Sequence, residues 1–148
     1  MFAGDERAEL CAALILAFND DPDRAAKLAH DVEQRRPSLD IAAAIEAYAL
    51  ARPGRSGDAT AVLERLQWIG RERYVLASFT AAAYVALGDR DSAIAELRTA
   101  EEARCPWFFQ TLADPRLSTL HGHPEFERMK RLLESMEATI APESGCMV

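Results

Sequence analysis

Cys105, Pro106 and Trp107 form the stretch of this sequence that comes nearest to a catalytic motif. A cysteine near the start of a helix can act as a nucleophile, because the helix N-terminus lowers the pKa of its thiol. No His or Asp lies nearby in the sequence to act as a base, so we interpret Cys105 as a small buried side chain at a junction between helices. The chain also contains no GxGxxG, GxxxxGK[ST], GxSxG or HExxH motif. We therefore predict that the protein is not an enzyme.

The three histidines are candidate metal ligands by residue type alone. His121 and His123 flank Gly122 and could be combined with Cys105, but this spacing matches no standard zinc pattern. His123 precedes a proline and is interpreted as a helix-entry residue. His30 lies among Ala and Asp residues and is interpreted as solvated or as a helix cap. We expect no metal site and no cofactor.

Composition predicts an all-α protein. The 148 residues suffice for a single domain, and the chain is 49% hydrophobic and rich in alanine, which favours helices that approach closely. The net charge of −7 argues against nucleic acid and against an anionic membrane surface as partners. The three cysteines show no short ligand spacing, and the N-terminus lacks the basic and apolar regions of a secretory signal. We expect a cytoplasmic protein with reduced thiols.

The chain repeats itself at intervals of 34 residues. Three trios of small or aliphatic residues keep this spacing, with members four and then three residues apart, which places each trio on one face of a helix. The trios are Ala25, Ala29 and Val32; Ala59, Leu63 and Leu66; and Ala93, Leu97 and Ala100. The small first member indicates close packing against a preceding helix.

A partner helix precedes each trio. Leu16 and Tyr84 lie nine residues before the first alanine of their trios, whereas Tyr48 lies eleven before Ala59. The middle turn, ARPGRSGD, therefore contains two extra residues. Each of the three turns supplies an Asp that can cap the second helix. The pattern predicts three antiparallel helix pairs.

Helix pairs with a 34-residue period are similar to those of tetratricopeptide repeat (TPR) proteins. The resemblance rests on small, aromatic and aliphatic residues at the spacing of that family. The third repeat matches best, and the first lacks the tyrosine while the second lacks the closing proline. The matching residues are Ala13, Leu16, Ala25, Ala29, Val32 and Pro37; Tyr48, Ala59, Leu63 and Leu66; and Ala81, Tyr84, Ala93, Leu97 and Ala100, with Pro106 one place late.

The resemblance implies a right-handed α-solenoid of about three TPR-like helix pairs with C-terminal capping helices. We place the repeats at approximately 6–37, 38–73 and 74–106, a capping segment at 107–137 and a frayed tail at 138–148. The closing segment resembles the end of TPR arrays attached to bacterial signalling modules. Its aromatic trio 107–109 either packs the end of the array or forms an exposed patch. The last helix carries an apolar stripe: Phe126, Met129, Leu132, Leu133 and Met136.

The resemblance also implies a function. The first helix of each pair would line a concave, apolar groove that binds a partner peptide or an amphipathic helix. That helix could come from a partner protein, from a second copy in a homodimer, or from residues 124–136 of the chain itself. The alternative is a dimerisation or regulatory module of a larger bacterial signalling protein. The groove positions are Arg7, Leu10, Leu14 and Phe18; Leu39, Ala42 and Glu46; and Val75, Ser78, Ala82 and Val85.

Overall fold

Helices make up the regular structure of the chain, as the composition predicts. The computed structural model describes residues 5–19, 21–52 and 54–144, and the side chains of these residues except 6, 18 and 140–144. No strand occurs within these ranges. The helices are α1 (Glu6–Phe18), α2 (Pro22–Arg35), α3 (Asp40–Ala51), α4 (Ser56–Ile69), α5 (Ala77–Ala86), α6 (Arg90–Glu102), α7 (Phe108–Leu112), the 3-10 helix η1 (Pro115–Leu120) and α8 (Pro124–Ser144).

The first six helices form three hairpins in a common register. Helices α2, α4 and α6 begin at Pro22, Ser56 and Arg90, so their starts are 34 residues apart. Ala25, Ala59 and Ala93 are therefore each the fourth residue of a helix, and each is fully buried. The other six members of the predicted trios are also buried. The sequence prediction of equivalent buried positions is confirmed.

Two of the three predicted aspartate caps are present. The carboxylate of Asp21 accepts a hydrogen bond from the backbone N–H of Arg24 at the start of α2, and Asp89 accepts one from Ser92 at the start of α6. The prediction fails for α4, because this helix begins at Ser56 and places Asp58 inside its first turn. Asp58 instead accepts a hydrogen bond from Arg55. The extra residues of the middle turn therefore lie before the helix and leave the 34-residue register intact.

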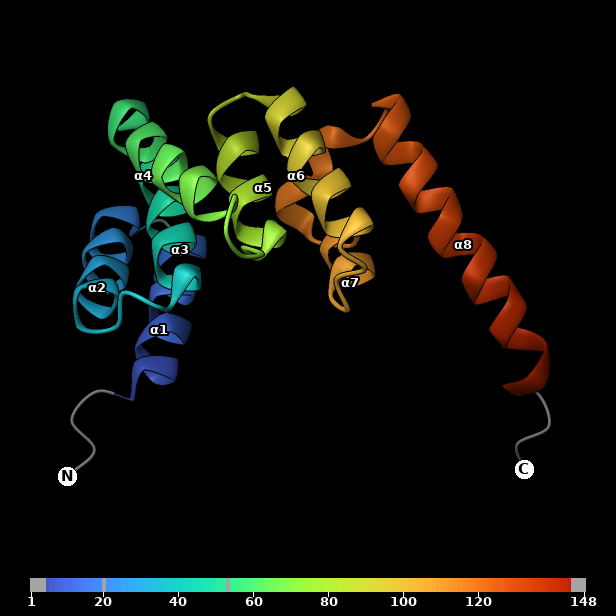
Figure 1. Ribbon diagram of the computed structural model, residues 1–148, viewed down its shortest axis with the longest axis horizontal. Helices are drawn as coiled ribbons and strands as arrows, with labels where there is room; N and C mark the ends of the chain where they lie inside the picture. The colour runs from blue at the N-terminus through green and yellow to red at the C-terminus, as the bar shows by residue number, and fades with distance from the viewer. Residues whose placement is uncertain (1–4, 20, 53, 145–148) are drawn as a thin grey trace.

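The hairpins follow one another along the molecule in the order of the sequence. Helix α3 packs against α2 and α4 and also against α5, and α5 packs against α6. The result is an arch with α1 and α2 at one end and α8 at the other (Figure 1). One hydrophobic core extends from Ala17 of α1 to Met129 of α8. A smaller cluster fills the space among α1, α2 and α3.

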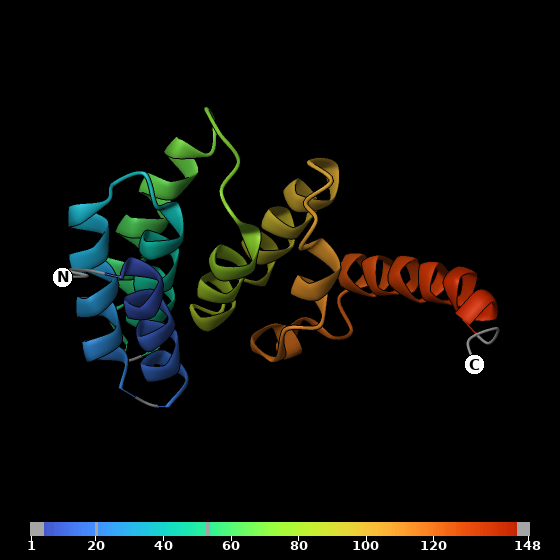
Figure 2. The same ribbon diagram turned by 90° about the horizontal axis from the view of Figure 1, so that it is seen from below.

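Helix α8 only partly follows its predicted role. Phe126 and Met129 are fully buried, but Leu132 and Met136 of the same stripe are exposed. Beyond its first turns the helix projects from the body of the molecule (Figure 2). It also runs to Ser144, past residue 137 where we expected the ordered part to end. Residues 145–148 of the predicted tail lie outside the described part.

A helix that crosses a bilayer must be both long and apolar. Helix α8 has 21 residues, but charged side chains interrupt it throughout. None of the described helices is both long and apolar enough to cross a bilayer.

The buried alanines of the second helices should not tolerate larger side chains without a loss of stability. Replacing the buried Ala93 with Leu should lower the free energy of unfolding by about 1–3 kcal/mol, because the added side chain must fit between closely packed helices. The control is Ala95→Leu on the exposed face of the same helix, which should change it by less than about 0.5 kcal/mol. Urea unfolding followed by circular dichroism measures both. Equal effects of the two substitutions would contradict the packing assigned to Ala93.

Candidate functional site

The predicted groove positions differ widely in accessibility. Ala42 and Ala82 are fully buried, and Leu10 and Glu46 are nearly so. These four offer little surface to a partner protein, because α3 packs directly against α1 and α5. Arg7 is exposed, and the side chain of Phe18 lies outside the described part. The half-buried positions are Leu14, Leu39, Val75, Ser78 and Val85.

The chain itself covers part of the face formed by the first helices. Helix η1 packs against α5, and its Leu117 and Leu120 are fully buried. The guanidinium of Arg116 lies 5.1 Å from the ring centroid of Tyr48 and 4.7 Å from that of Phe79. The Nε–H of Arg116 donates to the carboxylate of Asp114 at 3.0 Å. Residues 124–136 were one of three sources considered for a helix on this face; in the structure, residues 115–120 lie against it.

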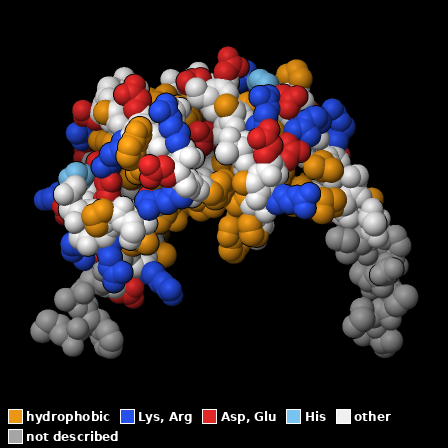
Figure 3. Space-filling model, in the orientation of Figure 1, with side chains coloured by type: hydrophobic (Ala, Val, Ile, Leu, Met, Phe, Trp, Pro, Cys, Tyr) orange, Lys and Arg blue, Asp and Glu red, His pale blue; other side chains and the backbone are white. Residues whose placement is uncertain are grey.

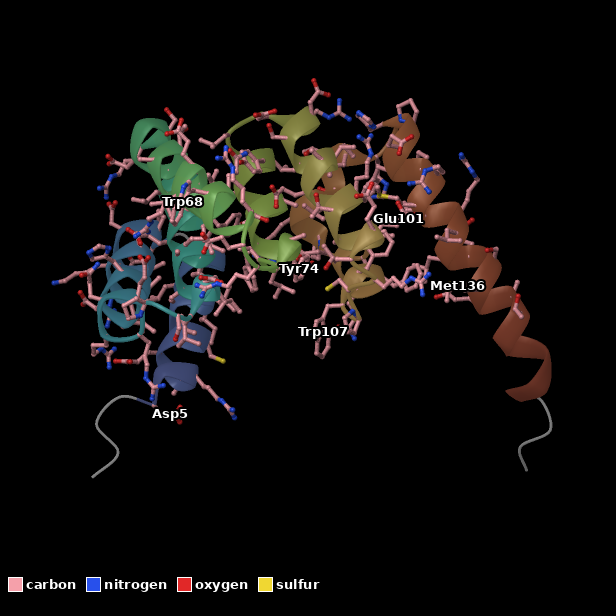
Figure 4. The ribbon with its side chains drawn as sticks, in the orientation of Figure 1. Asp5, Trp68, Tyr74, Glu101, Trp107 and Met136 are labelled. Carbon is pink, nitrogen blue, oxygen red and sulfur yellow. The ribbon has the colours of Figure 1, made fainter. Side chains whose placement is uncertain are left out.

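A second apolar surface follows the inner edge of the arch. It consists of Tyr74, Cys105, Trp107, Phe109, Leu132 and Met136, and we call it the arch surface. Hydrophobic side chains gather along this edge below α5 to α7 and on the first part of α8 (Figure 3). Trp107 points into the arch, and Met136 points from α8 toward α7 (Figure 4). Trp107 is 56% exposed, and Tyr74, Leu132 and Met136 are each at least 40% exposed.

A hollow of about 510 Å³ lies within the arch surface. Its apolar walls include Cys105 and Phe109 on one side and Leu132 and Met136 of α8 on the other. A smaller hollow of about 220 Å³ adjoins Trp107 and is also lined by the predicted groove residue Ser78. The exposed apolar side chains therefore border two concave regions.

The aromatic trio at the start of α7 divides between the two expected roles. Phe108 is buried in the main core, while Trp107 is exposed and Phe109 is half-buried. The rings of Phe108 and Phe109 are 5.3 Å apart at an angle of 57°. Successive residues of a helix point in different directions, so one side packs the end of the array while the other contributes to the arch surface.

Arg104 adopts an unusual backbone conformation at the edge of this surface. Its φ is +52°, and it follows Ala103, the C-cap residue of α6. The N–H of Cys105 donates to the carbonyl of Ala100, and the N–H of Arg104 donates to that of Glu101, which is the Schellman arrangement. Gly88 ends α5 in the same way with a φ of +80°. Glycine adopts this conformation freely, whereas an arginine is strained in it.

An ion pair joins α6 to α8 at the rim of the hollow. Arg128 donates from one terminal nitrogen to Oε1 of Glu101 at 3.0 Å. The hydrogen bonds and positive charge of Arg128 lower the pKa of the Glu101 carboxyl, with burial acting in the opposite direction. This pair links the first part of α8 to α6 beside the hollow, which Glu101 also lines.

Cys105 is the only nucleophilic candidate on the arch surface within the described residues. Tyr74 lies beside it, and burial raises the pKa of the Tyr74 phenol, with a hydrogen bond to Cys105 as the next cause. A phenol with a raised pKa keeps its proton at neutral pH and cannot act as the base that a catalytic thiol requires. Tyr74 therefore does not supply a base for Cys105, whereas the apolar side chains around the two residues can bind apolar groups.

The three histidines considered as metal ligands make different contacts in the structure. His123 accepts a hydrogen bond from the N–H of Glu125 at 3.3 Å, in keeping with its interpretation as a helix-entry residue. His121 and Phe126 make an edge-to-face ring contact with an angle of 84° between the rings. His30 is not merely solvated, because its Nδ1 lies 3.2 Å from Oε1 of Glu46 on the next helix. Sequence reasoning missed this contact, since it joins residues of different hairpins.

We compared the chain with known proteins. No family model matches it, and the comparisons with curated proteins and with solved structures found no significant match.

Substitutions at the two Schellman turns should change the free energy of unfolding in opposite directions. Arg104→Gly should raise the free energy of unfolding by about 1 kcal/mol, because the strain of the left-handed conformation is removed. Gly88→Ala should lower it by a similar amount, since its φ is also positive and no steric neighbour lies within 4 Å of an added Cβ. Chemical denaturation measures both. A loss of stability in Arg104→Gly would mean that the contacts of the arginine side chain outweigh the strain.

The Glu101–Arg128 pair predicts a dependence on pH. Because the folded-state pKa of Glu101 is lowered, its stabilisation is present above the usual glutamate pKa of about 4.3 and is lost as the pH falls further. Glu101→Gln should reduce the free energy of unfolding by less than about 1 kcal/mol at neutral pH, as both partners are partly exposed. The difference should vanish in acid. Exposed Glu102→Gln is the control, and a difference that stays constant with pH would contradict the assignment.

Proposed function

We propose that the protein is an interaction scaffold whose arch surface binds a short helix or peptide of a partner protein. The observation that carries this proposal is the exposure of Trp107, Leu132 and Met136 on one surface, where the last two line a hollow with apolar walls. Exposed apolar patches of this kind mark sites of protein interaction, and tryptophan is the residue most enriched where binding energy concentrates.

We further propose that the three hairpins are TPR-like units stacked as a right-handed solenoid. The 34-residue register of α2, α4 and α6 supports this, as does the equivalent burial of Ala25, Ala59 and Ala93. In stacked repeats each unit contacts its neighbours and presents an extended surface to a ligand. TPR-like stacking therefore gives the arch surface a rigid support.

The shape of the arch surface suits an amphipathic partner. The larger hollow, at about 510 Å³, lies in the range of clefts that enclose sizeable ligand groups. Glu101 and Arg104 stand at its edge beside the apolar walls. An apolar centre with a polar rim is the usual anatomy of a protein interface. A helix with one apolar stripe would place its large side chains in the hollow and its polar side toward the rim.

The alternative function is self-association, as in a dimerisation or regulatory module of a larger bacterial signalling protein. The observation favouring it is the exposure of Leu132 and Met136 on the projecting part of α8. Pairing of two α8 helices would cover these side chains. Sedimentation distinguishes the two proposals, because self-association through α8 makes the mass depend on concentration and Leu132→Ser would abolish that dependence.

The scaffold proposal predicts a specific effect of Trp107. The immobilised chain should retain a partner from a lysate of its source organism, identified by mass spectrometry, and Trp107→Ser should weaken its binding at least tenfold by calorimetry. The matched control is Trp68→Ser, because Trp68 is 60% exposed on α4, away from the arch surface. Retention that survives Trp107→Ser, or no retained protein at all, would contradict the proposal.

A further inference from the structure

A polar cluster lies between the first and second hairpins, outside the arch surface. It joins His30 and Glu33 of α2 to Glu46 of α3. One ligand atom from each of the three residues lies within 4.8 Å of the other two. Among the described residues, these are the ones that come together as three or more potential metal ligands.

Glu46 contributes a buried carboxylate with one unpaired oxygen to the cluster. The residue is 9% exposed, and its Oε1 lies 3.2 Å from Nδ1 of His30. Its Oε2 is buried and has no hydrogen-bond partner. A buried carboxylate oxygen without a partner is costly, and native structures keep such atoms where they serve a ligand or a proton. The second oxygen of Glu46 therefore indicates an occupant.

The two carboxylates of the cluster have different partners. Arg65 of α4 neutralises Glu33 through two contacts, from one terminal nitrogen to Oε1 at 2.7 Å and from the other to Oε2 at 3.0 Å. Within the described part of the chain, Glu46 has no arginine partner of this kind; its neighbours in the cluster are the imidazole of His30 and the carboxylate of Glu33. Two carboxylates thus lie close together in a mostly buried site. A bound cation would relieve the repulsion between them.

We propose that His30, Glu33 and Glu46 bind a divalent transition-metal cation of the zinc class. An imidazole with two carboxylates is a ligand set that Zn²⁺ accepts, whereas Ca²⁺ requires more oxygen ligands. The side chain of His30 is 49% exposed, so its ring can rotate to bring the three ligands onto one ion. A hollow of about 460 Å³ bordered by His30 and Glu46 admits water as a fourth ligand.

Metal binding would have a structural consequence. The three ligands come from helices of two different hairpins, and Arg65 adds a third helix to the same cluster. A bound ion would fasten α2 to α3 and stabilise the N-terminal half of the arch. This role is independent of the partner binding proposed for the arch surface.

A proton is the competing explanation for the same geometry. Burial raises the pKa of the Glu46 carboxyl, and the nearby Glu33 adds to this effect while His30 opposes it. A protonated Glu46 could donate to Glu33 and leave no role for a metal. The two explanations differ in their response to added zinc.

The test uses the full chain and zinc chloride alone. Calorimetry at neutral pH should show one tight equivalent, and thermal unfolding should shift to higher temperature with added zinc. His30→Gln should weaken zinc binding at least tenfold, while His121→Gln, a matched change at another exposed histidine, should leave it unchanged. The Co²⁺-substituted protein should show no thiolate charge-transfer band, which separates this site from one formed by cysteines.

A second variant distinguishes loss of zinc binding from loss of folding. Glu46→Gln preserves the shape of the side chain and removes the buried charge, so the metal-free protein should be at least as stable as the wild type. It should nevertheless lose the response to zinc. The proposal is overturned if zinc leaves the unfolding temperature unchanged, if His30→Gln binds zinc as tightly as the wild type, or if cobalt reports thiolate ligands.

Discussion

The close approach of helices at three equivalent alanines is the constraint on which the structure depends. Ala25, Ala59 and Ala93 each occupy the first turn of a second helix, and none has exposed surface. A larger side chain at these positions would push the helices of a hairpin apart, because protein interiors have little free volume. Small residues therefore set the spacing within each hairpin, and that spacing allows the next hairpin to follow in register.

The last of the three hairpins has an apolar side that must be covered in another way. The third hairpin has no fourth hairpin to cover it, and the chain solves this with α7, η1 and the first turns of α8. Phe108, Leu117 and Phe126 are buried there. The covering is incomplete, since Trp107 and Met136 remain exposed. The proposed binding surface is thus a consequence of how the array ends.

Buried polar groups mark the places where neighbouring helices are joined most specifically. Gln67 of α4 donates to the hydroxyl of Tyr84 on α5 at 2.6 Å, and burial is the main cause that raises the pKa of Tyr84 to about 12. Arg116 is held between Asp114 and the rings of Tyr48 and Phe79. These groups have partners that fix one arrangement of the helices. Oε2 of Glu46 lacks such a partner, and we therefore propose that the cluster around it binds a ligand.

The sequence by itself determined the helices, their pairing and the face that each second helix buries. These follow from local rules, because alanine content and spacings of three and four residues fix both helix and face. Only the tertiary structure decided that Ala42 and Ala82 are inaccessible, that η1 covers the first helices and that the aromatic trio divides. It also brought His30 to Glu46. Such contacts join residues far apart in the chain, and their partners depend on how the hairpins are placed, which no local spacing encodes.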